Sequence, residues 1–478
     1  MIELNRKQVH TIRSTIRRAL GMASTRRALT VTFQATADGL LIRALNGHVA
    51  IECRVPGNFG PSCFAIPFEA LVKCEGRHDD TVRFENSDDQ VILNWSDAGI
   101  PQSARYQSAE PVSMPALAPD LVEIDRQFLN AMAEACNTTD GDSTRYALNC
   151  IRLRGADGQI AATDGRQALI QTGFEFPWAD EILIPATDAF ATKAVRESQN
   201  VAIGRTPDHL IVRANAWTIM IQIEKDRRFP AIDSQVPNVS AAATKLVLSE
   251  GDAEFLIRAA NRLPGAQDAH SPVTLDLNGA VVVRAKSNGQ SSITDLVLRN
   301  SRRVGEEMKV STDRGFLKRA VQLGFHEIHL RDADAPAFCR DSRRTYLWAV
   351  LGKEAVIKPD ANATRIESPS VGRTDRVAPT KAVASPSDQS PLPDPIRNRI
   401  TMSTPSTTSI HEPTTGTAGA SSKTLSALIA EGEQLRATLR DVLSRTNALV
   451  VGLKRQRQQS NAMRTALKSL RAMQAIEV

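Results

Sequence analysis

The sequence predicts an α+β protein in which one unit, made of two helices packed on β-sheets, occurs three times. Helix-start residues recur at a nearly constant spacing, hairpin turns recur at the same spacing, and aromatic residues stop at Trp348. The chain has 478 residues, of which 42% are hydrophobic and only 4% aromatic. At about 150 residues per domain, this length suits three domains with mainly aliphatic cores.

Each unit is expected to open with a short strand followed by a capped helix. The capping residues are Asn5, Asp125 and Ser249, which lie 120 and 124 residues apart. Side chains of these types accept hydrogen bonds from the free amides of a first helical turn. The recurrence of one cap at one spacing indicates a repeat.

A hairpin with a tight turn follows each of these helices. Asp-Gly and Asn-Gly supply the positive φ angles that two-residue turns need. The three hairpins are 31–44 around Asp38-Gly39, 151–163 around Asp157-Gly158, and 273–285 around Asn278-Gly279.

A second helix and a second hairpin are expected to complete each unit. The second helices follow short strands at 65–67, 183–185 and 309–311, and the closing hairpins are 82–95, 201–213 and 326–339. The predicted domains are therefore 1–118, 119–238 and 239–358.

Beyond residue 358 the composition changes. Nine of the 24 prolines fall in 359–423, among Ser, Thr, Ala and Gly and without any aromatic residue, so this segment is predicted to be a disordered linker. From 424 to 478 apolar residues recur in steps of three and four, which predicts a coiled-coil helix. One long helix, two helices meeting near Gln456, and a helix packed back on the body all remain open.

Charge and composition restrict the protein class. The net charge of +6 resides in 359–478, which hold 16 Lys and Arg against 10 Asp and Glu, so the body is neutral. No apolar run long enough for a membrane span and no signal-type N-terminus is present, and the six cysteines follow no metal or disulfide spacing. We expect a cytoplasmic protein with reduced thiols and no membrane contact.

The sequence motifs do not indicate a catalytic site or a metal site. His326-Glu327-Ile328-His329 lies on an expected strand, where positions three apart face opposite ways. No phosphate-binding or dinucleotide-binding glycine loop occurs, and no nucleophile with its base can be nominated. We therefore expect no enzyme activity, no metal and no cofactor.

The first helix carries a basic side opposite its apolar face. Val9, Ile12, Ile16 and Leu20 are expected to point inward, and the other side shows Arg6, Lys7, Arg13, Arg17 and Arg18. Such a side is either ordinary solvated surface or a surface that contacts nucleic-acid phosphates. Later helices also carry basic residues, at Lys193, Arg196, Lys318 and Arg319. The acidic residues Asp252 and Glu254 reduce the positive charge in the third unit.

Several motifs occur in the order found in one known family. These are Arg145-Tyr146-Ala147-Leu148-Asn149, then Ala162-Thr163-Asp164-Gly165-Arg166, then Arg228-Phe229-Pro230 with Val236-Pro237, and finally Phe316-Leu317-Lys318-Arg319-Ala320. Over about residues 1–355 the chain resembles the bacterial sliding clamp, the beta subunit of DNA polymerase III.

The resemblance implies the DNA clamp fold and a function. Two chains of three clamp domains would close head to tail into a ring around duplex DNA and tether a replicative or repair DNA polymerase, with a clamp loader as a further partner. Such a protein would act at the nucleoid. The alternative is a clamp-fold scaffold, assembled through its C-terminal coiled coil with itself or a partner, that is not loaded on DNA.

The resemblance and the basic helix faces together nominate two sets of residues. The expected DNA-binding residues are Arg13, Arg17, Arg18, Arg26, Arg27, Arg145, Tyr146, Lys193, Arg196, Lys318 and Arg319. The expected cleft for partner peptides comprises Leu148, Thr163, Gly165, Arg166, Pro230, Trp348, Val350 and Leu351.

Overall fold

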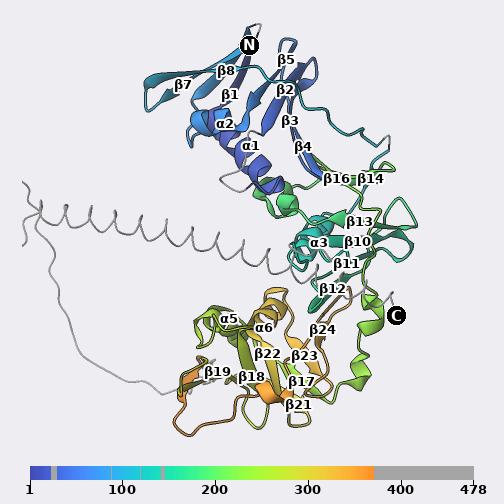
Figure 1. Cartoon of the computed structure of the whole chain (residues 1–478), viewed down its shortest axis with the longest axis vertical. Helices are drawn as coiled ribbons and strands as arrows, with labels where there is room; N and C mark the ends of the chain where they lie inside the picture. The colour runs from blue at the N-terminus through green and yellow to red at the C-terminus, as the bar shows by residue number, and fades with distance from the viewer. Residues whose placement is uncertain (23–28, 88, 119, 142–145, 371–478) are drawn as a thin grey trace, which may run out of the picture. The chain divides into compact units, whose positions relative to one another are not determined.

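The computed structural model describes residues 1–22, 29–87, 89–118, 120–141 and 146–370, all within one compact unit, Met1–Ala378 (Figure 1). The predicted coiled coil at 424–478 and most of the predicted linker lie outside the described residues, as do Arg26, Arg27 and Arg145.

The first unit follows the predicted order of elements. Asn5 caps the first helix by accepting a hydrogen bond from the Gln8 amide, while the Gln8 side chain accepts one from the Asn5 amide. This reciprocal box explains why the helix begins at Arg6. The elements are β1 Ile2–Asn5, α1 Arg6–Ala19, β2 Thr30–Thr36, β3 Gly39–Asn46, β4 Val49–Val55, β5 Ser62–Pro67, α2 Phe68–Cys74, β6 Thr81–Ser87, β7 Gln90–Asp97 and β8 Ile100–Gln107.

The second unit departs from the prediction at its second helix. A 3₁₀ turn, Asp188–Ala191, and a single α-helical turn replace it, because Thr192 between them is extended (φ −74°, ψ 140°). The elements are β9 Val122–Glu123, α3 Gln127–Cys136, β10 Cys150–Arg154, β11 Gln159–Thr163, β12 Gln167–Gln171, β13 Glu181–Pro185, α4 Lys193–Arg196, β14 Val201–Arg205, β15 His209–Ala214 and β16 Trp217–Gln222.

The third unit repeats the order and adds two strands. Ser249 caps its first helix by accepting from the Asp252 amide, as predicted. The elements are β17 Thr244–Val247, α5 Glu250–Ala259, β18 Pro272–Asp276, β19 Val282–Lys286, β20 Ile293–Val297, β21 Arg302–Gly305, β22 Lys309–Asp313, α6 Arg314–Gln322, β23 Glu327–Leu330, β24 Ala337–Arg340, β25 Arg344–Trp348 and β26 Thr364–Glu367.

Strand β26 corrects the predicted start of the linker at residue 359. It pairs in parallel with β20, and Ser368 directly after it is only 2% exposed. Proline and polar composition predicted disorder, but four residues suffice for a strand when a sheet edge is available to pair with. The folded body therefore extends past the predicted boundary at 358.

The sheets continue from one unit into the next. The strand order β5-β2-β3-β4-β16-β15-β14-β9 joins the first unit to the second, and β13-β10-β11-β12-β25-β24-β23-β17-β21 joins the second to the third. Both junction pairs, β4 with β16 and β12 with β25, are antiparallel. The remaining sheets, β1-β6-β7-β8 and β22-β18-β19-β20-β26, belong to the first and third units alone.

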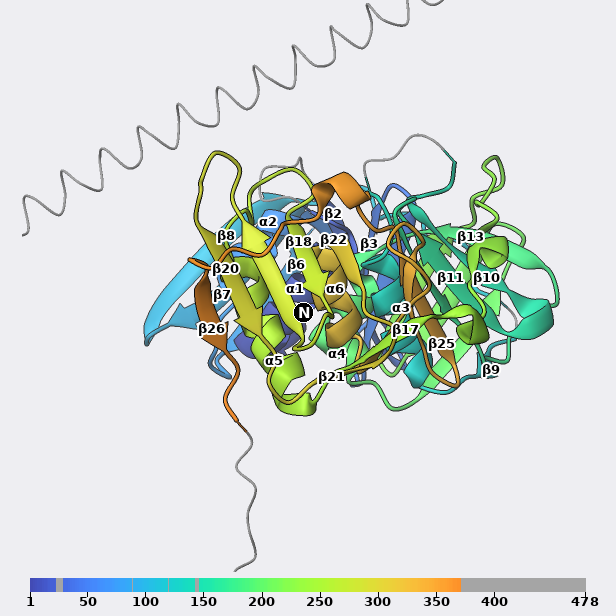
Figure 2. The ribbon, with the colours of Figure 1, turned by 90° about the horizontal axis from the view of Figure 1, so that it is seen from below.

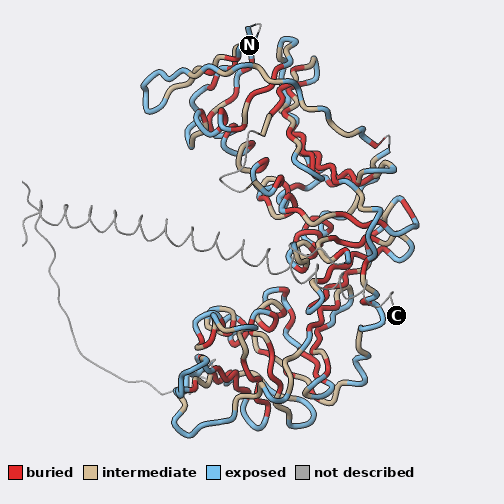
Figure 3. The backbone as a smooth tube through the Cα atoms, viewed as in Figure 1, coloured by how far each residue is buried: buried red, intermediate tan, exposed pale blue. Residues whose placement is uncertain are grey.

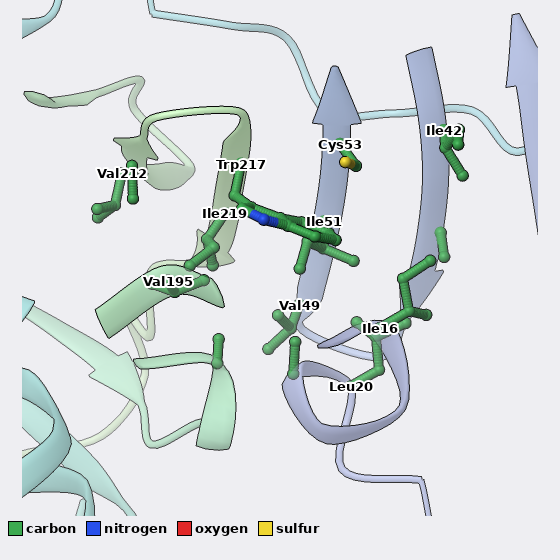
Figure 4. Close-up of a cluster of buried hydrophobic side chains, with 14 of the residues drawn as sticks. Ile16, Leu20, Ile42, Val49, Ile51, Cys53, Val195, Val212, Trp217 and Ile219 are labelled. Carbon is green, nitrogen blue, oxygen red and sulfur yellow. The ribbon is translucent and has the colours of Figure 1, made fainter. Parts of the chain in front are cut away.

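Buried residues concentrate on these sheets and on the inner sides of the helices (Figure 3). One hydrophobic core extends from the first unit through the β4–β16 junction into the second. Figure 4 shows Ile51 of β4 and Ile219 of β16 at this junction, with Ile16 of α1 and Val195 of α4 in the same cluster. A second core fills the third unit.

Candidate nucleic-acid interface and partner cleft

The helices of neighbouring units contact one another in a row. Helix α1 packs against α2 within the first unit and against α4 of the second, and α4 packs against α3. Arg319 of α6 then donates to the carbonyl oxygen of Glu134 in α3, at 2.7 Å, and α6 packs against α5. Because their apolar sides cover the sheets, the helices turn their polar sides away from the core.

Five of the predicted basic residues are exposed on this row. Lys7 lies in the first turn of α1, Arg17 and Arg18 lie in its last turn, and Lys193 and Arg196 lie on α4. A hollow of about 460 Å³ between the two helices is lined by residues that include Arg18 and Lys193. The helix dipole also favours cations in the last turn of α1, which stabilises Arg17 and Arg18 at their positions.

Two arginines predicted on the exposed basic side of α1 are instead bound to other parts of the chain. Arg6 is 6% exposed and donates to the carbonyl oxygens of Cys74, Glu75 and Ser96. Arg13 is ion-paired with Glu75, with its Nε 2.5 Å from the carboxylate. Helical spacing placed both residues opposite the apolar stripe, but the segment after α2 covers that part of the helix.

The third unit offers fewer free basic groups on its helices. Lys318 is half-buried, and Arg319 is engaged at the junction with α3, where it also donates to the Thr138 hydroxyl at 2.7 Å. Burial lowers the pKa of the Arg319 guanidinium. Burial likewise raises the pKa of the Glu134 carboxyl, against the lowering effect of Arg344 and Arg319. Arg319 therefore joins two units, which its sequence position did not indicate.

Tyr146 is exposed in the segment between α3 and β10. The residue is 65% exposed, and its backbone adopts a positive φ of 51°. Few non-glycine residues adopt this conformation, and those that do so cluster at functional sites.

The structure brings together part of the predicted partner cleft. Leu148 is half-buried beside Gly165, where an added Cβ would lie 3.7 Å from a Leu148 methyl group. Arg166 accepts a hydrogen bond from the Ala349 amide through its carbonyl oxygen and stacks its guanidinium 4.9 Å from the Phe316 ring centre. These contacts join the end of β11 to the chain that leaves β25.

The other residues predicted for the cleft either pack in the core or lie in connecting segments. Thr163 is buried and donates to the Gln167 carbonyl, and Pro230 is half-buried in the connector between units. Trp348 is 2% exposed and donates its Nε1 hydrogen to the Thr312 hydroxyl at 2.9 Å, so its side chain belongs to the core of the third unit. Val350 and Leu351 are half-buried, and Leu351 bridges to Ser311.

Comparisons with known proteins identify the fold. No protein-family model and no curated protein matches the sequence. Solved structures do match: the DNA polymerase III subunit beta of Pseudomonas aeruginosa superposes with a TM-score of 0.59 at 14% identity, over 73% of this chain and 99% of that one. The beta subunit of DNA polymerase from Streptococcus pyogenes gives 0.61 at 14% identity, with 73% and 99% covered. The sliding clamp of Bacillus subtilis gives 0.60 at 15% identity, with 73% and 98% covered.

The chain has the fold of the bacterial sliding clamp. The predicted fold class is thereby confirmed for the three repeated units, and the resemblance read from the motifs agrees with the structural neighbours. Because the matches cover nearly all of each neighbour but about three quarters of this chain, the clamp fold is complete here and a further segment is added to it.

Two exposed arginines beside the helix ends were not indicated by the sequence pattern. Arg126 precedes α3, and Arg262 follows α5. Both lie next to a helix end rather than within the repeating helical spacing, so an amphipathic pattern could not nominate them. Arg258 on α5 is exposed too, but it forms an ion pair with Glu254 of the same helix at 3.2 Å.

The described part of the chain shows no other ligand chemistry. Among the described residues, no group of His, Cys, Asp or Glu side chains is arranged to hold a metal ion, and no helix has the length and apolar character to cross a membrane. His329 lies on β23, where its ring stacks 5.0 Å from that of Phe338.

Proposed function

We propose that this protein is a non-catalytic DNA clamp, two copies of which close head to tail around duplex DNA and tether a DNA polymerase. The observation that carries the proposal is the clamp fold with exposed arginines and a lysine on its row of helices. Cationic side chains release counterions from DNA without reading sequence, which suits a protein that must slide.

The proposed DNA contacts are the predicted residues that the structure leaves exposed. They are Arg17, Arg18, Tyr146, Lys193 and Arg196, with half-buried Lys318 at the edge of the set. Arg13 and Arg319 are left out because they are half-buried and their guanidinium groups have partners within the protein. Lys193 is 3.8 Å from Glu197 and Arg196 donates to Asn130, but both side chains are exposed, so they stay in the set. The neutral body charge agrees with a local basic surface balanced by acidic residues elsewhere.

The way the units join supports a head-to-tail ring. In β4 the fifth residue, Cys53, lies opposite Trp217, the first residue of β16. In β12 the fifth residue, Gln171, lies opposite Arg344, the first residue of β25. Continuing the repeat, the fifth residue of β20 would lie opposite the first residue of β8 in a second copy. A contact of this heterologous kind closes a ring when the rotation permits.

Tethering would raise the effective concentration of the polymerase at its primer end. We assign the docking of partner peptides to the surface around Leu148, Gly165 and Arg166, since Leu148 and Arg166 are not fully buried there. Trp348 would support this surface from the core rather than touch a peptide.

Topological linkage to DNA tests the proposal directly. The full chain is incubated with linear duplex DNA biotinylated at both ends, streptavidin is then added, and the salt is raised. A ring threaded on the DNA remains bound until a restriction enzyme cuts the duplex, whereas on unblocked DNA it slides off. Equal loss from blocked and unblocked DNA would exclude encirclement and favour the scaffold alternative.

Replacing Arg17 and Arg18 with Ala is expected to weaken low-salt DNA association equally for all sequences. Each lost phosphate contact lowers the slope of log K against log salt by about 0.9, so the double variant should lose a slope of about 1 to 2. Fluorescence anisotropy over a salt series measures this slope. Arg213→Ala is the matched control, because Arg213 is an exposed arginine on strand β15 instead of a helix. An unchanged slope in the double variant would remove both residues from the contact surface.

A further inference from the structure

The edge of β20 that the repeat reserves for a second copy is already paired. Strand β26 lies along it in parallel, with Thr294 opposite Thr364 and Leu296 opposite Ile366. Figure 2 shows β26 beside β20 at the end of this sheet. In the first and second units the corresponding strands, β4 and β12, pair instead with the next unit.

The chain reaches this edge by crossing the sheet of the third unit. After β25 the Leu351 amide donates to the Ser311 carbonyl in β22, the opposite edge strand. The Ser311 hydroxyl then donates to the Ala355 carbonyl at 3.0 Å, and the Ile357 amide donates to the Thr274 hydroxyl of β18 at 2.8 Å. These bonds guide residues 351–357 from β22 across β18 toward β20.

Polar contacts hold the far end of β26 in place. The Ser368 amide donates to the Val297 carbonyl at 2.9 Å, and the Ser368 hydroxyl accepts from the Arg299 amide at 2.9 Å. Arg299 also forms an ion pair with Glu367 at 2.8 Å. Nearby, the buried Asp252 carboxylate accepts hydrogen bonds from Ser301 and Asn300. Burial raises the pKa of this carboxyl group, but hydrogen bonds from Ser301, Ser368 and Asn300 outweigh burial, so the pKa is lowered.

We propose that β26 competes with a second copy of the chain for the edge of β20, so that ring closure requires its release. The inference rests on the proposed ring, because it names the surface that closes it and the segment that covers that surface. The register of the two existing junctions puts Val297 opposite Ile100 and Thr294 opposite Ser103 of the second copy.

The contacts of β26 suit an exchangeable strand. All four of its residues are exposed, including Ile366 at 42%, so the strand is held by backbone and polar bonds more than by apolar burial. Strand β8 is twice as long, and the described residues place no strand along its outer edge at the end of the sheet β1-β6-β7-β8. The attachment of β26 to the same chain gives it a high local concentration, against which a second copy must compete.

A disulfide cross-link between copies reports occupation of the β20 edge. The full chain carrying Ser103→Cys and Thr294→Cys can form this link only after β26 has left Thr294. The parent chain and each single variant, oxidised in parallel, account for links made by the native cysteines, including the exposed Cys63. Non-reducing gels measure the fraction of cross-linked dimer.

Two proline substitutions in β26 then distinguish the state in which β26 covers the β20 edge from the state in which it has left that edge. Because the Ser368 amide faces β20, alternation along the strand turns the Ile366 amide toward β20 and the Arg365 amide away from it. Ile366→Pro removes a donor from the ladder and should raise the cross-linked fraction about tenfold. Arg365→Pro is the matched control, since proline is tolerated where the amide faces solvent, and it should leave the fraction unchanged.

The outcomes distinguish the two levels of the proposal. Strong cross-linking that is the same with and without Ile366→Pro would overturn competition by β26 while leaving ring closure at β20 intact. Absence of cross-linking in every variant would overturn ring closure at this edge, and competition with it. An increase in cross-linking with Arg365→Pro as large as with Ile366→Pro would show that the effect does not depend on the hydrogen bonds between β26 and β20, which also contradicts the proposal.

Discussion

Replacing Arg314 with Met is expected to destabilise the third unit by about 3–5 kcal/mol, because several buried backbone carbonyls lose their donor at a cost of about 1–3 kcal/mol each. Arg314 is 3% exposed, and its guanidinium donates to backbone carbonyl oxygens of the segment between α5 and β18. The acceptors are the carbonyls of Ser271, Ala260, Leu263, Pro264 and Pro272. Each carbonyl left without a donor carries a desolvation cost.

Hydrogen exchange of peptides from α6 and β18 measures the loss in unfolding free energy within the third unit. A local measurement is needed because a chain of several units need not unfold in one step. Arg17→Met is the control, an arginine-to-methionine change at an exposed position, and its effect should stay within about 0.5 kcal/mol. Arg314→Lys should recover only part of the loss, because an ammonium group cannot reach all five carbonyls. A loss in Arg314→Met no larger than in Arg17→Met would contradict the structural role.

The repeat itself was readable from the sequence because its signals are local. The cap at Asn5 needs only Gln8, three residues away, and the turn at Gly158 needs only a backbone with φ of 60°. Such signals act within a few residues, so they can persist when the rest of a unit diverges. The cap predicted at Asp125 is wrong by one position: the N-cap of α3 is Arg126, and Asp125 before it accepts from the Gln127 amide. Three copies in step then indicated the fold more strongly than any single motif.

The roles of individual arginines could not be read in the same way. Arg6 and Arg314 are the first residues of α1 and α6, and both bind backbone carbonyls that come from elsewhere in the chain. A helical wheel gives the direction of a side chain but not which loop will lie above it. The basic side of α1 was therefore predicted to be larger than the exposed set Lys7, Arg17 and Arg18.

Strand β26 was missed for a related reason. Thr364–Glu367 has no apolar alternation and follows Pro359, so composition favoured a linker. Its pairing depends on β20 offering an edge, which is a property of the assembled sheet and not of the segment. The same dependence makes the strand exchangeable in principle, since any second strand that fits the edge can take its place.

Replacing Arg284 with Met is expected to cost about 3–5 kcal/mol at neutral pH, because it leaves two carboxylates without their cation. Arg284 is 3% exposed and lies between Asp276, at 2.8 Å, and Asp295, which it binds with both Nε and Nη2. Burial lowers the pKa of the Arg284 guanidinium, but the two carboxylates outweigh burial and raise it, so the group stays charged. Lys309 lies 3.5 Å from Asp276 and replaces only part of the lost charge.

The cost of Arg284→Met should depend on pH in a direction set by the carboxylates. Without the guanidinium, two largely buried negative charges are left without their main partner, and adding a proton to either carboxylate removes one of these charges. The variant should therefore approach the parent in urea unfolding at acidic pH. Adding Asp276→Asn and Asp295→Asn to the variant should remove most of this pH dependence, whereas a pH-independent loss would mean that packing of the arginine stem dominates. Since Asp295 lies on β20, opposite the position that the repeat assigns to Gln102 of a second copy, the same ion pairs also fix the strand at which the ring is proposed to close.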